Sequence, residues 1–256
     1  MAGWCPMGNG SSRELRMLHT SDVHIGYVSG TEGDHHEPCQ CPIHGLLSTV
    51  ERHEVDVLMV AGDLFDHGRL QTESVGLTLD LLASAEIPVV IIPGNHDVHD
   101  EASLWERCRP QVERSGVLLL DDHAGTTLDL FEGSLRIWGK AMPEHEPGYR
   151  PLGDVPARPD DAWFVVAGHG HLNLTPDDRH RSSPITHEEI GATGADYVAL
   201  GHWHVTTDAS HEGVTAWYPG TPMGKPGNGT AALVTFGEAI RVEHVSVEPP
   251  PHGCWS

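Results

Sequence analysis

Five apolar runs in this chain each end directly in side chains that are able to bind a metal ion. In chain order, the side chains that follow these runs are Asp22 and His24; Asp63; Asn95, His96 and Asp97; His169; and His202 and His204. Most of them stand behind a glycine, which lets the backbone turn sharply and approach a neighbour closely. Ligands of α/β sheets bind beyond the carboxyl ends of the strands, so these groups can converge in space. The pattern constrains the chain to strands that share one functional edge.

The first half of the chain alternates strand and helix patterns. The predicted elements are strands at residues 15–20, 55–61 and 87–92, and helices at about residues 43–54 and 72–85, the last with Thr72 as N-cap. This alternation predicts an α/β fold with a largely parallel sheet and covering helices.

The second half is richer in strands. Predicted strands lie at residues 117–120, 126–130, 135–139, 163–167, 197–200, 215–218, 231–236 and 241–247. A Pro/Gly-rich loop is predicted at 143–159 and a polar loop at 175–184. Because no repeat or long linker divides the chain, we expect a single domain at residues 14–247, with flexible termini at 1–13 and 248–256.

The charge of the chain is strongly acidic. It has 15 Lys and Arg against 37 Asp and Glu, a formal net charge of −22. This argues against a protein that holds nucleic acid by a basic surface. No stretch approaches the roughly 18 apolar residues of a membrane span, and the N-terminus lacks a signal-peptide pattern. The five cysteines are an odd number and widely spread, so they predict no disulfide framework, and we expect a cytoplasmic protein without membrane contact.

The candidate ligands are carboxylates, imidazoles and one amide, with no thiolate. This mixture suits Mn²⁺, Fe or Zn²⁺ better than it suits a closed structural cysteine site. Asp22 and His24 are two residues apart on an extended strand end and so share a face, as do His202 and His204. A carboxylate between the two groups could bridge two ions, and Asp63 is the candidate.

The order of these motifs resembles that of the calcineurin-like metallophosphoesterases, whose pattern is Asp-x-His, Gly-Asp, Gly-Asn-His-Asp/Glu, Gly-His and Gly-His-x-His. Four segments are similar to the SbcD-like DNA repair exonuclease branch of that family, namely Leu18–Gly26, Val60–Asp66, Ile92–Asp97 and Trp217–Pro222. The resemblance covers about residues 14–247. It implies an αββα sandwich with two divalent metal ions, Mn²⁺ first and Fe or Zn²⁺ as alternatives, in the loops at one end.

The resemblance also implies roles for individual residues. One metal would be held by Asp22, His24 and His204, the other by Asn95, His169 and His202, with Asp63 as the bridge, His96 as the catalytic acid, and Asp97 accepting a ring N–H bond that orients His96. Asp66 matches a position near the site. His171 is an alternative to His169, because Gly168-His-Gly-His171 offers two histidines; we favour His169, since it follows the strand directly.

The implied function is hydrolysis of phosphodiester bonds, with a nuclease-like reaction on DNA ends as the first interpretation. Nuclease relatives carry further chain that caps the DNA groove and docks an ATPase partner subunit, whereas this sequence stops at Ser256. The acidity also favours a small-molecule or cyclic-nucleotide phosphodiesterase or a phosphatase as the second interpretation. A third is a non-catalytic scaffold, which the complete ligand set and His96 argue against.

A separate histidine and cysteine segment spans residues 35–44, with Cys39 and Cys41 at its centre. It could bind Zn²⁺, but Cys-x-Cys is tighter than the usual spacing of structural zinc ligands. We favour a polar loop near the mouth of the site.

Overall fold

The computed structural model describes residues 14–27, 39–223 and 228–248. The termini that the sequence predicts to be flexible lie outside these ranges, except for Glu248. Residues 35–38 of the histidine and cysteine segment also lie outside them, so the zinc hypothesis stays a prediction.

One sheet is built on parallel strands from the first half of the chain. Its order is β14-β13-β1-β2-β3-β4, in which β13 and β14 are antiparallel additions next to β1. The bounds are β1 Leu15–Thr20, β2 Val57–Ala61, β3 Val89–Ile92, β4 Leu118–Leu119, β13 Gly229–Phe236 and β14 Ile240–Val247. Leu18 of β1 pairs in register with Leu58 of β2, and Leu58 with Val89 of β3. All of β2 is buried, as expected for a parallel strand covered on both faces.

A second sheet comes from the second half and has the order β11-β12-β10-β7-β6-β5. The bounds are β5 Thr126–Leu130, β6 Leu135–Gly139, β7 Trp163–His169, β10 Tyr197–Gly201, β11 Thr207–Asp208 and β12 Thr215–Tyr218. Strands β6, β7, β10 and β12 run parallel, with β5 and β11 antiparallel at the two edges. A small separate pair joins β8 His171–Leu172 to β9 Pro184–Ile185.

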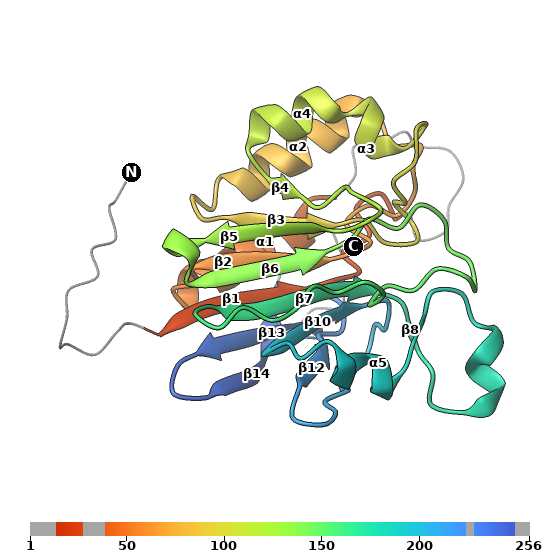
Figure 1. Ribbon diagram of the computed structural model, residues 1–256. Helices are drawn as coiled ribbons and strands as arrows, with labels where there is room; N and C mark the ends of the chain where they lie inside the picture. The colour runs from red at the N-terminus through yellow and green to blue at the C-terminus, as the bar shows by residue number, and fades with distance from the viewer. Residues whose placement is uncertain (1–13, 28–38, 224–227, 249–256) are drawn as a thin grey trace.

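Side-chain alternation divides the core into layers. Leu18 and Leu58 belong to a cluster with Trp105 and residues of the helices, whereas the neighbouring Met17 and Val57 pack with the second sheet. The helices of the first layer are α1 Cys41–Arg52, α2 Thr72–Ala83, α3 Leu104–Arg107 and α4 Arg109–Ser115. Figure 1 shows α2, α3 and α4 together on one side of the first sheet, and the short α5 (His187–Ala192) beyond the second. The predicted αββα sandwich and the single domain are confirmed.

The sequence mispredicted several short elements. Thr72 is the first residue of α2 and not its N-cap; Gln71 takes that place without a side-chain hydrogen bond. The predicted loop at 175–184 contains a 3₁₀ helix, Pro176–His180, and another lies at Phe131–Gly133. The helices α3, α4 and α5 are too short to show a clear apolar period. Among the described residues, no helix is both long and apolar enough to cross a membrane.

Candidate metal centre

Every predicted ligand lies where a central strand ends. Asp22 and His24 follow β1, Asp63 follows β2 and Asn95 follows β3, while His169 is the last residue of β7 and His202 and His204 follow β10. These strands come from both sheets, so the two halves of the chain meet at this edge.

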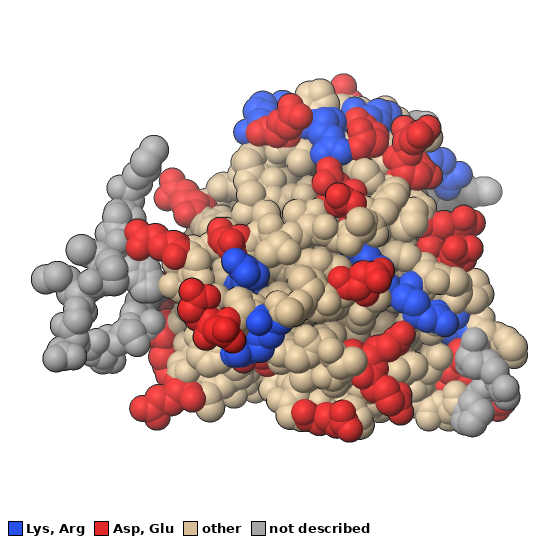
Figure 2. All heavy atoms as spheres, in the orientation of Figure 1, with Lys and Arg blue, Asp and Glu red and all other residues tan. Residues whose placement is uncertain are grey.

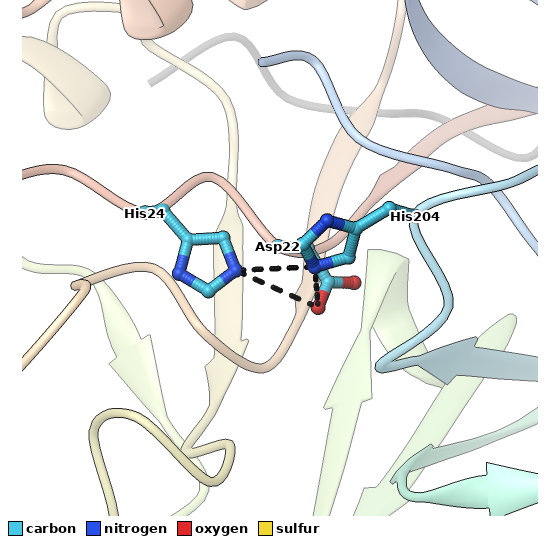
Figure 3. Close-up of side chains that lie close together, drawn as sticks. All are labelled: Asp22, His24 and His204. Atoms are coloured by element: carbon cyan, nitrogen blue, oxygen red, sulfur yellow. Dashed lines mark hydrogen bonds and ion pairs between the residues drawn. The ribbon is translucent and has the colours of Figure 1, made fainter. Parts of the chain in front are cut away.

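A first group of ligand atoms forms around Asp22. Its Oδ1 lies 3.5 Å from Nε2 of His204 and 4.0 Å from Nε2 of His24, and the two imidazole nitrogens are 3.3 Å apart. Figure 3 shows the two rings and the carboxylate directed toward one another. The other oxygen, Oδ2, accepts hydrogen bonds from the Ser21 hydroxyl and, at 3.0 Å, from the His202 backbone N–H. Buried Oδ1 has no hydrogen-bond partner, and a buried carboxylate oxygen without one needs a cation or a donor.

A second group forms around the amide of Asn95. Its Oδ1 lies 2.9 Å from Nε2 of His169 and 2.9 Å from Nδ1 of His202. The other ring nitrogen of His169 donates to the backbone oxygen of Ala61 at 2.8 Å. This bond fixes the orientation of the ring, so that Nε2 of His169 is the nitrogen that faces the site.

Asp63 stands between the two groups. Its Oδ2 lies 3.4 Å from Nε2 of His169 in the second group and 3.9 Å from Nε2 of His24 in the first. Its Oδ1 accepts the backbone N–H of His96 at 2.8 Å, which holds the carboxylate in this position. The arrangement is that of a carboxylate able to contact two ions at once.

The backbone at these positions is unusual for residues with side chains. Four of the cluster residues have positive φ, namely Asp22 (54°), His24 (48°), Asp63 (53°) and His202 (107°). Each such conformation costs of order 1–3 kcal/mol and persists only where the surroundings impose it.

Two glycines allow the loops to approach closely. A Cβ on Gly94 would overlap with Oδ1 of Asp63, and one on Gly62, whose φ is +88°, would overlap with Nδ1 of His169. A side chain at either position would push a candidate ligand out of place.

His96 is not oriented as the sequence predicts. Its Nδ1–H donates to the backbone oxygen of Asp66 at 2.7 Å. The Asp97 carboxylate is instead engaged by two backbone N–H groups, those of Gly94 at 2.7 Å and Phe65 at 3.1 Å. The predicted ring contact between His96 and Asp97 is therefore wrong: Asp97 ties the loops after β2 and β3 together. Burial and the nearby charge of Asp63 raise the pKa of Asp97 to about 7.

Asp66 contacts both histidines on this side of the site. Its Oδ1 lies 3.0 Å from Nδ1 of His24, while its backbone oxygen holds His96. This carboxylate lies on the Nδ1 side of His24, and the other ring nitrogen, Nε2, is the one that faces Asp22.

The pKa values of the histidines in the cluster are shifted in opposite directions. Burial depresses the pKa of His202 to about 3, and the neighbouring His169 adds to the effect, so His202 is neutral at pH 7 as a ligand must be. Burial also opposes charge on His169, but the carboxylates of Asp63 and Asp22 outweigh it and raise the pKa of His169 to about 9. The cluster attracts positive charge, since the metal-free protein stabilises a proton there.

His171, the alternative to His169, lies outside the two groups. Its Nε2 is 3.7 Å from Oδ1 of Asp178, and its Nδ1 accepts from the indole N–H of Trp203 at 3.3 Å. Its ring centroid is 6.0 Å from that of His202. The structure thus brings His169 and not His171 into the ligand cluster.

Sequence reasoning missed His145, which lies beside the second group. Its ring centroid is 5.6 Å from that of His202, and its Nδ1 is 3.0 Å from Oγ of the buried Ser183. His145 belongs to the Pro-rich loop at 143–159, where no strand end or motif marks it. Only the three-dimensional path of the loop reveals its position.

A further group of potential ligands lies apart from the site. His99, Glu106 and Asp121 come together, but Arg109 forms ion pairs with both carboxylates. The guanidinium supplies the positive charge that a metal ion would otherwise bring.

Most of the chain is similar to known proteins. Residues 15–206 match the family model described as calcineurin-like phosphoesterase. The DNA double-strand break repair protein Mre11 of Methanopyrus kandleri is 27% identical over 224 residues, which cover 81% of this chain and 49% of that protein. In the nuclease SbcCD of Escherichia coli K12, the SbcD polypeptide is 35% identical over 89 residues, covering 32% of this chain and 21% of that polypeptide. The chain thus spans about half the length, or less, of these relatives.

The fold has a counterpart among solved structures. The protein TT1561 of Thermus thermophilus superposes with a TM-score of 0.59 at 11% identity, covering 92% of this chain and 100% of that one. This likeness supports the fold alone.

Proposed function

The chain belongs to the calcineurin-like phosphoesterase family, hydrolases that act on phosphoester bonds, and from this we propose that it is a two-metal phosphodiesterase with a nuclease-like reaction. The observation that carries the proposal is the place of Asp63 Oδ2 between two sets of ligand atoms. The domain that performs the reaction spans residues 14–247.

The side chains fit two divalent ions. Asp22, His24 and His204 would hold one ion, Asn95, His169 and His202 the other, and Asp63 would contact both. Oδ1 of Asp22 accepts no hydrogen bond, and a cation would satisfy it together with the facing nitrogens of His24 and His204. Oxygen and imidazole ligands without thiolate suit Mn²⁺ first, and Fe or Zn²⁺ next. When bound, such ions neutralise the phosphate charge and lower the pKa of water to near 7.

His96 supplies the proton in this proposal. Its Nδ1–H is bound to the Asp66 backbone oxygen, so Nε2 is the atom left to carry a proton to the departing oxygen. The ring is 42% exposed, which leaves it open to a substrate. The protonated leaving group departs as an alcohol and not as a poorly stabilised alkoxide.

The surface charges argue for short or single-stranded substrates over long duplex. Many of the cations in the described part of the chain already pair with carboxylates, and on the face seen in Figure 2 Lys and Arg lie beside Asp and Glu. The paired cations are Arg16, Arg109, Arg114, Arg136, Lys140, Arg150, Arg158, Arg181 and Arg241. Duplex binding commonly uses about 6–10 phosphate contacts. We infer that tight binding of DNA ends needs a partner subunit, such as an ATPase, to supply a groove.

The test compares a diester with a monoester that has the same leaving group, bis(p-nitrophenyl) phosphate and p-nitrophenyl phosphate, with Mn²⁺, Fe²⁺ and Zn²⁺ in turn. We expect diester turnover to exceed monoester turnover and to require metal. Asp63→Asn should abolish it. Asp129→Asn, which removes a carboxylate on β5 that pairs with Arg136 on β6, should not. Monoester turnover well above diester turnover would make the protein a phosphatase, and no turnover with any metal would contradict the proposal.

A further inference from the structure

A cavity of about 460 Å³ adjoins the first group of candidate ligands. It is lined by His24, His96 and His204 from the site together with Tyr27, Pro42 and Met223. The volume lies within the range of pockets that bind small organic ligands. A phosphate bound at the candidate metal centre would carry its substituent on the His96 side into this cavity.

Tyr27 is an unusual feature of this cavity. It is 60% exposed, although large aromatic side chains normally bury their rings. Its backbone position is fixed relative to the site, because its N–H donates to the His24 backbone oxygen at 3.0 Å and Ile25, two residues earlier, pairs with Phe65. An aromatic ring held at the edge of a cavity and left open is suited to contact a ligand.

The chemistry of the lining selects the kind of ligand. None of the described residues that line the cavity is Lys or Arg, and Asp66 contributes a carboxylate, so a second phosphate would be repelled. Tyr27, Pro42 and Met223 instead offer an aromatic face, a ring and a polarisable thioether. A planar uncharged ring system fits these surfaces, and a nucleobase is such a ring attached to a phosphoester.

We propose that this cavity binds the nucleobase of the leaving nucleoside, stacked on Tyr27. The assignment to the leaving side rests on the function proposed above, because His96 lines the same cavity and gives its proton to the departing oxygen. Water adds its oxygen to phosphorus and releases a proton to solvent. The P–O bond to the leaving nucleoside breaks, and that nucleoside takes up the proton from His96. Tyr27 thereby makes the reaction selective for nucleoside esters over simple alkyl esters.

The test uses thymidylyl-thymidine and its two abasic analogues, in which one nucleoside at a time carries a tetrahydrofuran in place of the base-bearing sugar. The leaving hydroxyl stays a sugar alcohol in all three, and the product that retains the phosphate identifies the leaving side. Stacking of one base on an aromatic side chain is worth about 5- to 150-fold by alanine substitution. We expect loss of the leaving-side base to lower kcat/KM by such a factor, and loss of the other base to change it less than about threefold.

Variants of Tyr27 test whether the stacking contact, and not a general effect of substitution on activity, causes the discrimination. Tyr27→Ala should reduce the discrimination between base and abasic leaving groups to less than about threefold, whereas Tyr27→Phe should retain it. Leu77→Ala, which truncates an exposed apolar side chain on α2 away from the cavity, should behave as the wild type. Unchanged discrimination in Tyr27→Ala, or none in the wild type, would overturn the inference.

The experiments distinguish failure of the pocket assignment from failure of the proposed phosphodiesterase function. If the wild type cleaves bis(p-nitrophenyl) phosphate but ignores the leaving-side base, only the pocket assignment is wrong. If it cleaves no diester, the proposed function fails, and calorimetric titration with thymidine still tests the pocket. Binding that Tyr27→Ala weakens by about fivefold or more would support the pocket, and binding equal in both proteins, or absent, would reject it.

Discussion

The buried side chain of His19 should make the free energy of unfolding of the metal-free protein decrease at acidic pH. The side chain lies in β1, is fully buried and has its Nδ1 2.8 Å from the hydroxyl of Tyr197. Burial lowers the pKa of His19 from 6.5 to about 3. Between these two values the unfolded chain binds a proton that the folded chain does not bind, so stability is lost as the pH falls below 6.5. At about 1.36 kcal/mol per pKa unit, the fall from pH 7 to pH 5 is about 2 kcal/mol.

The assay is urea denaturation of the metal-free protein at pH 7 and pH 5 in the presence of a chelator. His19→Asn keeps a polar atom near the Tyr197 hydroxyl but cannot titrate, so its free energy of unfolding should fall by about 2 kcal/mol less than that of the wild type over this range. His44→Asn removes an exposed imidazole on α1 and is the matched control, with the wild-type pH dependence. An equal pH dependence in His19→Asn and the wild type would refute the reasoning.

Three further predictions concern the site. Asp63→Asn should lose both metal ions together, because one carboxylate serves both groups, whereas His204→Ala should chiefly lose one; two ions bound at wild-type affinity in Asp63→Asn, measured by metal analysis after dialysis, would exclude the bridge. His96→Ala should keep both ions and lose roughly 10²–10⁴ in rate, with a smaller loss for acidic leaving groups; an equal loss for good and poor leaving groups would count against the acid role. Gly94→Ala should destabilise the protein by about 1–3 kcal/mol and lower its metal content without removing a ligand, since the new Cβ would overlap with Asp63 Oδ1; Gly68→Ala, with nothing within 4 Å, is the control that should change neither.

The positions of the candidate ligands were accessible from sequence because they depend on local signals. An apolar run specifies a buried strand, a glycine specifies where the chain turns, and parallel strands of a sheet end at the same edge. Asp22, Asp63, Asn95 and His169 lie together in the structure, as this rule predicts. These positions can be predicted without knowledge of the side-chain packing in the rest of the molecule.

The hydrogen-bond partners of His96 and Asp97 could not be predicted from the sequence in the same way. The two residues are neighbours in a tight turn, and the turn directs Asp97 inward to the backbone of Gly94 and Phe65 while His96 stays at the surface. Which acceptor meets the His96 ring depends on the loop after β2, where Asp66 lies. His145 was missed for a similar reason, because a long loop brings it to the site.

The backbone of the cluster is strained because the chains that follow β1 and β2 stay hydrogen-bonded to each other beyond the ends of these strands. Beyond β1 and β2, the backbone N–H of Asp22 still donates to Gly62 O at 3.1 Å, and that of His24 donates to Asp63 O at 3.0 Å. The two ligand loops therefore hold each other through backbone hydrogen bonds that owe nothing to a bound ion. Positive φ at Asp22, His24 and Asp63 follows from bending the chain while these bonds are kept. An arriving cation meets ligand atoms that already converge, so little of its binding free energy is lost in ordering the loops.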